Sequence, residues 1–323
     1  MRRVTIFLLA LFTCFVSHLL LASGQDTSRS EERPDLPVSP QQVAALQERA
    51  NQGDALAQLM LGNAYMKGTG VPQDDRTAAR WYASASSQNL ANAQAALGYL
   101  YEQGRGVQKD YRAAFHYYQA AALQGNAIAQ NNLAEMYQQG RGTSRNPAEA
   151  LRWYRASALA GDAIAQCNLA MMYLGSRGIP PDHEQAARWF RAAAEQGIPQ
   201  AETTLSAMYY KGVGVAINYT EAAAWARRAA EQGFPLAQEN LAYMFEQGKG
   251  VPLDYVAAYA WYSAAAAGGR TDSAAQMKSL AKVMLREQVR LAEARELAWA
   301  AEHSKVVPWG NRDSGTLSLL AEK

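Results

Sequence analysis

The stretch AQLMLGNAYMKGTGVPQDDRTAARWY at residues 57–82 decides the fold, because its pattern returns at residues 237–262 as AQENLAYMFEQGKGVPLDYVAAYAWY. Between the two stretches, the pair Ala57-Gln58 recurs at a constant spacing of 36 residues, with Glu202 replacing the glutamine once. A fixed period of this length predicts a solenoid of stacked repeats. The chain is therefore compared by columns, where a column is the same position in each of the six repeats.

Each repeat has the pattern of two helices joined by a turn. Leucines recur at the column of Leu61, four residues before an aromatic column that begins with Tyr65, and this spacing gives a first helix one apolar stripe. Paired glycines such as Gly68 and Gly70 tolerate the positive φ that ends a helix. Asp or Asn then recurs at the column of Asp74, where the side chain accepts the free amides of a second helix.

The second helix is expected to pack on the first through a small residue beside a large ring. Ala78 begins an alanine column, and Trp81 begins an aromatic column three residues later, so we expect these rings in the core. The expected fold class is all-α. It is a right-handed α-solenoid of six 36-residue helix-turn-helix repeats over residues 55–270, with helical caps at residues 41–54 and 271–303.

These columns resemble the Sel1-like repeat, a helix-turn-helix relative of the tetratricopeptide repeat. That repeat has the form A-x-x-x-L-G-x-x-Y-x-x-G-x-G-V, then Asp, then A-x-x-W-Y-x-x-A-A-x-x-G, and the match covers about residues 41–303. The resemblance implies a protein-binding scaffold in which the first helices line a concave groove that holds a segment of the partner. It also implies that LREQVRLAEARELAWAAEH, at residues 285–303, is a terminal helix.

The amino terminus predicts export. Arg2 and Arg3 precede an uncharged run at residues 4–22, and the small residues that follow suit a signal peptidase. We expect residues 1–24 to be a cleaved signal peptide, which places the mature protein in the periplasm or outside the cell. A polar, proline-bearing stretch at residues 25–40 is expected to be a flexible linker.

An uncleaved anchor is the alternative for the same segment. Residues 4–22 nearly span a bilayer and would hold the protein at the inner membrane, although Ser17 and His18 inside the run argue against this. A membrane is therefore a partner only if the segment stays uncleaved. At the other end, residues 304–323 are expected to form a flexible tail.

Charge and cysteine content exclude several classes of protein. The chain has 31 basic and 29 acidic residues, and two of the basic residues leave with the signal peptide, so nucleic-acid binding through bulk charge is not expected. Cys14 also leaves, and Cys167 then remains alone without a disulfide partner. A cysteine-rich branch of the resembled family, described as β-lactamase-like, carries a Cys pair in each repeat, and this chain does not.

The histidines show no spacing that would indicate catalysis. His18, His116, His183 and His303 stand at unrelated positions of the repeat, and none forms a metal-ligand or proton-relay pattern. Cys167 has no base near it in sequence, and a buried spare thiol is the favoured interpretation. We therefore predict no catalytic residue, no cofactor and no metal site.

The predicted partner-binding surface lies on the first helices. At about 100° per residue, the columns of Leu59, Asn63 and Met66 point away from the core and vary in residue type. The alternative is a solvated face with no partner, but its large apolar and aromatic members favour a groove. The predicted groove residues are Tyr99, Glu102, Asn131, Glu135, Gln138, Met171, Leu174, Thr203, Tyr210, Glu239, Tyr243 and Glu246.

A second stripe lies in the glycine loops, where cations recur one repeat apart. Its members are Arg105, Arg141, Arg177 and Lys249. Such a cationic rim would suit an acidic polysaccharide or an anionic membrane surface. Solvated loop charges are the favoured alternative.

The sequence thus predicts an exported, non-enzymatic scaffold that binds a protein or peptide segment. Two other classes stay open. A secreted factor that acts on host cells would use the same groove, and a hydrolase of the cysteine-rich branch is disfavoured by the missing cysteines.

Overall fold

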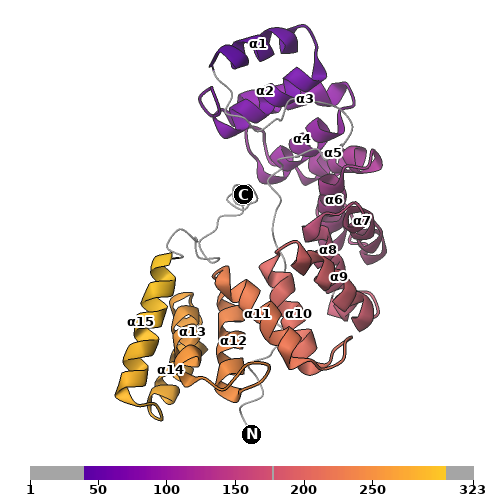
Figure 1. Cartoon of the computed structure of the whole chain (residues 1–323). Helices are drawn as coiled ribbons and strands as arrows, with labels where there is room; N and C mark the ends of the chain where they lie inside the picture. The colour runs from indigo at the N-terminus through magenta and orange to yellow at the C-terminus, as the bar shows by residue number, and fades with distance from the viewer. Residues whose placement is uncertain (1–39, 177, 303–323) are drawn as a thin grey trace. The chain divides into compact units, whose positions relative to one another are not determined.

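The computed structural model describes residues 40–176 and 178–302, and within them the chain is built from fifteen α-helices and no strand (Figure 1). The predicted signal peptide, the predicted linker up to residue 39, Arg177 and the predicted tail at residues 304–323 lie outside the described residues. The described helices fall into two compact units, which meet in sequence between Asp162 and Ala163.

The first unit consists of one helix followed by three helix pairs. Its helices are α1 (Pro40–Asn51), α2 (Ala55–Lys67), α3 (Asp75–Ser87), α4 (Ala91–Gln103), α5 (Tyr111–Leu123), α6 (Ala127–Gln139) and α7 (Pro147–Leu159). The two helices of each pair pack together, each second helix also packs on the first helix of the next pair, and α1 packs on α2. This order of contacts is that of stacked helix-turn-helix repeats.

The second unit has three further pairs and two terminal helices. Its helices are α8 (Ala163–Met171), α9 (His183–Glu195), α10 (Pro199–Lys211), α11 (Tyr219–Glu231), α12 (Pro235–Gln247), α13 (Tyr255–Ala267), α14 (Thr271–Ala281) and α15 (Arg286–Glu302). The pairs stack as in the first unit, and both α14 and α15 pack on α13. The two terminal helices therefore cover the last repeat.

The fourth repeat departs from the others at the end of its first helix. There, α8 continues into a π-helical turn at Met172–Ser176, in which Gly175 has a φ of 81°. In the second repeat, the left-handed residue that ends the first helix is Gly104. The fourth repeat has Ser176 in that column, so its glycine, Gly175, comes one column earlier. Because the glycine comes one residue early, the helix turns one residue early and the loop before Asp182 is longer.

The predicted start of the second helix is confirmed in every repeat. The side chains of Asp74 and Asp110 each accept hydrogen bonds from two backbone amides of the helix that follows. The other members of the column are also N-caps: Asn146, Asp182, Asn218 and Asp254. In addition, the backbone amide of each cap donates back to the first helix, as Asp110 does to the Tyr101 carbonyl at 2.9 Å. The cap residue therefore fixes the turn as well as the helix start.

The core follows the predicted leucine and alanine columns, whereas the predicted aromatic column is confirmed only in part, because Trp153 and Trp225 are buried and its other members are not. Trp81 and most members of its column are only partly buried, whereas the next residue is buried between the two helices. These buried residues are Tyr82, Tyr118, Tyr154, Phe190, Ala226 and Tyr262. One residue is a rotation of about 100°, which is enough to move a ring from the edge of a helix contact to its centre.

The buried ring also explains the small column on the first helix. A Cβ atom added at Gly62 would lie 2.5 Å from the ring of Tyr82, and one added at Gly98 would lie 2.8 Å from the ring of Tyr118. Those distances are shorter than non-bonded carbon–carbon contacts in proteins, so a larger residue would push the ring out of its place.

The second glycine of the loop makes the contact between successive repeats. A Cβ atom at Gly106 or at Gly142 would lie 2.1 Å from a backbone oxygen, that of Asp75 and Tyr111 respectively. Each of those oxygens belongs to the first residue of the second helix in the preceding repeat. Glycine is required here by close approach as well as by its positive φ.

We predict that Gly142→Ala destabilises the protein far more than Gly125→Ala. Both glycines have positive φ, so each substitution costs about 1 kcal/mol of backbone strain. No atom lies within 4 Å of a Cβ at Gly125, however, while a Cβ at Gly142 meets the Tyr111 carbonyl. Denaturant melts should show about 2 kcal/mol more loss for Gly142→Ala. Equal losses would mean that the repeats are not held at this contact.

The corrected core column gives a second prediction. Tyr118→Ala removes a fully buried ring and should lower the free energy of unfolding by about 3–5 kcal/mol. Tyr117→Ala should cost clearly less, because that ring is partly exposed and stacks only on Tyr101, with centroids 5.6 Å apart. Denaturant melts of the two variants provide the comparison. A larger loss for Tyr117→Ala than for Tyr118→Ala would place the column of Trp81, and not that of Tyr82, at the centre of the core.

Candidate partner-binding surface

One of the predicted groove columns is buried, which corrects its assignment. From Ala95 to Glu239, the column of Leu59 is at most 3% exposed, so Asn131, Thr203 and Glu239 do not line an accessible surface. The amide of Asn131 donates to Asn132 at 3.2 Å, and the hydroxyl of Thr203 donates to the Pro199 carbonyl at 2.7 Å. The error arises because a helix inside a stack is covered by neighbouring repeats as well as by its own partner helix.

Glu239 shows what covers this column. Its carboxylate is 1% exposed and forms an ion pair with Arg270, the residue that precedes α14. The contact therefore ties the first helix of the sixth repeat to the terminal helices. Cys167, in the same column, is a fully buried free thiol.

The other two columns, those of Asn63 and Met66, form what we call the first-helix stripe. Three of its predicted groove residues are nevertheless buried: Tyr99, Glu102 and Met171. The remaining predicted groove residues of the stripe are half-buried: Glu135, Gln138, Leu174, Tyr210, Tyr243 and Glu246. The accessible part of the surface is thus narrower than the sequence predicts.

Several polar residues of the stripe are held by the buried tyrosines of the second helices. Tyr118 donates its hydroxyl to Glu102 at 2.9 Å, and Tyr262 donates to Glu246 at 2.8 Å. Tyr154 donates likewise to Gln138 at 2.9 Å. Burial raises the pKa of Glu102, and the bond from Tyr118 opposes that shift. These side chains therefore have an internal structural role that the sequence did not reveal.

Two repeats have no tyrosine hydroxyl at this position. Where the buried residue is Phe190 or Ala226, no hydroxyl is available. The stripe residue of those repeats is Leu174 or Tyr210, neither of which needs a tyrosine donor. In the first repeat, Tyr82 instead donates to Asn63 of the stripe at 2.7 Å, and the residue in the Glu102 column is Met66.

In the first unit, the predicted rim cations are engaged inside the chain. Arg105 binds Asp75 through two hydrogen bonds of 2.9 and 2.8 Å. Arg141 lies 3.5 Å from a carboxylate oxygen of Glu102, and its guanidinium lies 5.6 Å from the ring centre of Tyr111. Both cations therefore have a carboxylate partner. Arg177 lies outside the described residues.

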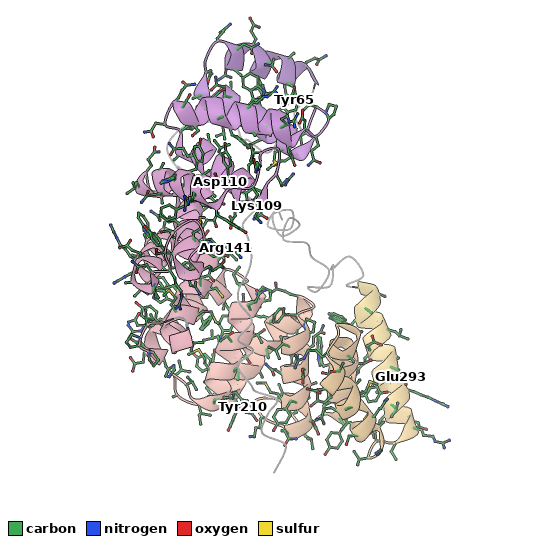
Figure 2. The ribbon with its side chains drawn as sticks, turned by 180° about the vertical axis from the view of Figure 1, so that it is seen from behind. Tyr65, Lys109, Asp110, Arg141, Tyr210 and Glu293 are labelled. Carbon is green, nitrogen blue, oxygen red and sulfur yellow. The ribbon has the colours of Figure 1, made fainter. Side chains whose placement is uncertain are left out.

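Stripe residues and loop cations meet where two repeats join, and we call each meeting point a junction cluster. A junction cluster consists of a stripe residue, the first residue of the second helix, a stripe residue of the next repeat and the loop cation of that repeat. Between the second and third repeats, it contains Glu102, Tyr111, Glu135 and Arg141. Arg141 is marked in Figure 2 within the first unit.

The second unit has an aromatic junction cluster between the fifth and sixth repeats, formed by Tyr210, Tyr219, Tyr243 and Lys249. The ring centre of Tyr210, marked in Figure 2, lies 5.1 Å from that of Tyr219 and 6.2 Å from that of Tyr243. The ammonium group of Lys249 lies 5.1 Å from the ring centres of both Tyr210 and Tyr219. All four residues are half-buried, so their outer edges face solvent.

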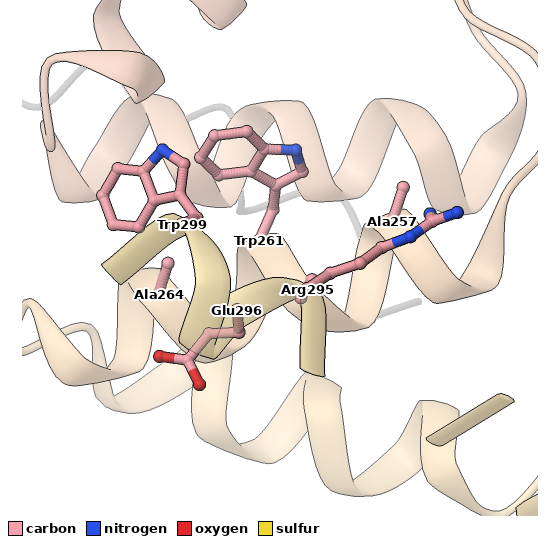
Figure 3. A pocket seen from close by; sticks show the side chains of 7 residues that line it. Ala257, Trp261, Ala264, Arg295, Glu296 and Trp299 are labelled. Atoms are coloured by element: carbon pink, nitrogen blue, oxygen red, sulfur yellow. The ribbon is translucent and has the colours of Figure 1, made fainter. Parts of the chain in front are cut away.

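A cavity between α13 and α15, which the sequence analysis did not identify, has a volume of about 200 Å³. Figure 3 shows the indole rings of Trp261 and Trp299 at its side; their centres are 5.6 Å apart and their planes meet at 63°. Its lining residues are Ala257, Ala260, Trp261, Ala264, Arg295, Glu296 and Trp299. Ala260 stands where other repeats have arginine, such as Arg152. The fifth repeat also has alanine in this column, at Ala224, so this column alone did not reveal that α15 covers the last repeat.

The fifth repeat contains a buried carboxylate, that of Glu202, where other repeats have a neutral glutamine. Gln124 and Gln196 each donate to the glutamine at the start of their own repeat, whereas Gln232 donates to Glu202 at 2.8 Å. The Glu202 carboxylate is fully buried and lies 3.0 Å from Nε of Arg228. Burial raises the pKa of Glu202 to about 7, although Arg228 opposes the shift.

Two kinds of feature are absent from residues 40–176 and 178–302. No group of three or more His, Cys, Asp or Glu side chains there is arranged to hold a metal ion. None of the helices in these residues has both the length and the apolar character needed to cross a membrane.

Comparison with known families finds the Sel1 repeat. The family model matches six consecutive segments: residues 55–90, 91–126, 127–162, 163–198, 199–234 and 235–269. A comparison with curated proteins found no match.

Two solved structures resemble the chain at the level of both fold and sequence. One is a protective antigen present in uropathogenic Escherichia coli strains, which displays an SLR fold; it is 32% identical, with a TM-score of 0.77 over 86% of this chain. The chain spans 62% of the length of that antigen. The other is a Sel1 repeat protein from Oxalobacter formigenes, which is 30% identical, with a TM-score of 0.62 over 70% of this chain and 90% of its own.

The buried carboxyl of the fifth repeat predicts a pH-dependent stability. The folded-state pKa of Glu202 lies above the ordinary value of about 4.3, so stability is lost as pH rises from about 4.3 through about 7. Glu202→Gln imitates the protonated form and the glutamine of other repeats. It should raise the melting temperature at pH 8 and change it little at pH 5, whereas exposed Glu195→Gln should have little effect at either pH. A rise of the same size at both pH values would contradict this assignment.

Proposed function

The chain belongs to the Sel1 repeat family, and on that premise we propose that it is an exported, non-enzymatic scaffold that binds a segment of a partner protein along the first-helix stripe. Solenoids of Sel1 repeats are typical of protein-interaction scaffolds. The proposal assigns the mature chain to the periplasm or the cell exterior. This localisation is supported by the positively charged start and uncharged run of residues 1–24.

The observation that carries the proposal is the aromatic character of the accessible stripe in the second unit. Tyr210 and Tyr243 are half-exposed neighbours, and their hydroxyls are hydrogen-bonded to each other. Rigid rings with an exposed edge are the side chains that most often anchor a protein interface. Tyr99 is left out of the proposed contact set because it is buried and accepts a hydrogen bond from Arg105.

A second candidate function is that of a secreted factor that acts on host cells. It is favoured by the resemblance to the protective antigen of uropathogenic Escherichia coli, whose structure aligns over 86% of this chain. The two candidates use the same surface and differ in the location of the mature protein. Detection in the culture medium would favour the secreted factor, and retention in the periplasm would favour the envelope scaffold.

The scaffold function predicts that capture of a partner depends on the exposed tyrosines. The double variant Tyr210→Ala, Tyr243→Ala should lose the partner protein that the wild-type chain retains in a pull-down from envelope extract. Its melting temperature should fall only slightly, because both rings are half-exposed.

The control for this experiment is Arg155→Ala, which removes an exposed side chain from α7. Capture should remain unchanged in the control. If the double variant stays folded and retains the partner, the stripe in the second unit is not the binding surface.

A further inference from the structure

We propose that the aromatic junction cluster of Tyr210, Tyr219, Tyr243 and Lys249 recognises a carboxylate side chain in an acidic segment of the partner protein. The inference rests on the proposed function and adds the chemistry of what is bound. Lys249 would pair with the carboxylate, and the tyrosines would contact the apolar part of the same segment.

Lys249 is held by aromatic rings. Its ammonium group contacts the rings of Tyr210 and Tyr219, both at 5.1 Å, and within the described part of the chain it forms no ion pair. Ring contacts orient a cation and stabilise it, but they do not neutralise its charge. The cluster therefore presents a positioned, half-buried positive charge next to solvent.

In two other repeats, the loop cation at this position is paired with a carboxylate of the chain. Arg105 has the carboxylate of Asp75 at 2.8 Å, and Arg141 has that of Glu102 at 3.5 Å. At the aromatic cluster, the two positions that supply those carboxylates are occupied by Tyr219 and Tyr210. The backbone arrangement is retained, since a Cβ at Gly250 would lie 1.9 Å from the Tyr219 carbonyl, but the internal anion is missing. A carboxylate supplied by a partner would complete this arrangement.

The neighbouring carboxylate of the chain does not take the place of the missing anion beside Lys249. Glu246, three residues after Tyr243 on α12, is close enough for its charge to help raise the pKa of Tyr243, and its carboxylate accepts a hydrogen bond from Tyr262. Glu246 is therefore held by a tyrosine hydroxyl, and among the described residues it forms no ion pair with Lys249.

The structure favours a peptide over an acidic polysaccharide. A polyanion needs several cations at regular spacing, and the predicted ladder is broken because Arg105 and Arg141 are already paired with carboxylates. One cation beside three aromatic rings instead suits a single Asp or Glu next to an apolar residue.

The test uses short random peptides displayed on phage and selected on the full chain without its predicted signal peptide. Recovered peptides are synthesised, and their affinity is measured by fluorescence anisotropy. The proteins compared are the wild type, Lys249→Met, Lys249→Glu and the control Lys278→Met, which alters an exposed lysine of α14. Circular dichroism melts establish that each variant is folded.

If the inference is right, the recovered peptides share an Asp or Glu. Lys249→Met should weaken their binding about tenfold, and replacing the acidic residue of the peptide by its amide should weaken binding to the wild type by a similar factor. Lys249→Met combined with the amide peptide should weaken binding no more than either change does alone. Lys249→Glu should prefer a peptide in which the acidic residue is replaced by lysine, and Lys278→Met should bind as the wild type does.

Three results would overturn the inference, and they separate it from the proposed function. Peptides that bind without an acidic residue, or that are insensitive to Lys249→Met, would leave the scaffold function standing without the carboxylate site. Binding of dextran sulfate that depends on Lys249, with no acidic peptide recovered, would assign the cluster to a polysaccharide. Failure to recover any peptide that binds the wild type would remove the proposed function together with the inference.

Discussion

The junctions between repeats depend on one backbone contact. In this contact, a loop glycine packs against the backbone oxygen of the first residue of the second helix in the preceding repeat. Gly106, Gly142 and Gly250 leave no room for a Cβ atom at this contact. The residue before each of these glycines is the loop cation, so the same contact places that cation beside the first residue of the preceding second helix. The pairing of Arg105 with Asp75 and the ring contact of Lys249 with Tyr219 both follow from it.

The core and the candidate surface are linked by the buried tyrosines. Each ring fills the space between the helices of one repeat, and its hydroxyl emerges at the stripe, where it fixes a polar side chain such as Gln138. Repeats without that hydroxyl place Leu174 or Tyr210 at the stripe instead. In three repeats, a tyrosine buried in the core therefore holds a polar side chain of the candidate surface in place.

The constant repeat length and the residues that begin and end each helix made most of the fold predictable. The site was harder to predict, because the sequence does not show which side of each helix the neighbouring elements cover. The spacing of Ala57-Gln58 and the cap column of Asp74 could be identified because each depends on local backbone chemistry. The burial of Glu239 could not, since it depends on Arg270, which lies outside the repeat. The cations of the rim were visible in the sequence, but their partners were not, because each partner lies about one period away.

The contact between repeats is made by a glycine and backbone atoms. The side chains around it can therefore differ from one repeat to the next without a change in that contact. Glu102 and Tyr210 occupy the same column, as do Arg141 and Lys249, yet both junctions keep the same glycine contact. Duplication or loss of a whole repeat would therefore copy or delete one recognition position together with the backbone that orients it. The composition of the candidate surface could therefore change by one whole repeat at a time while the backbone contact between repeats stays the same.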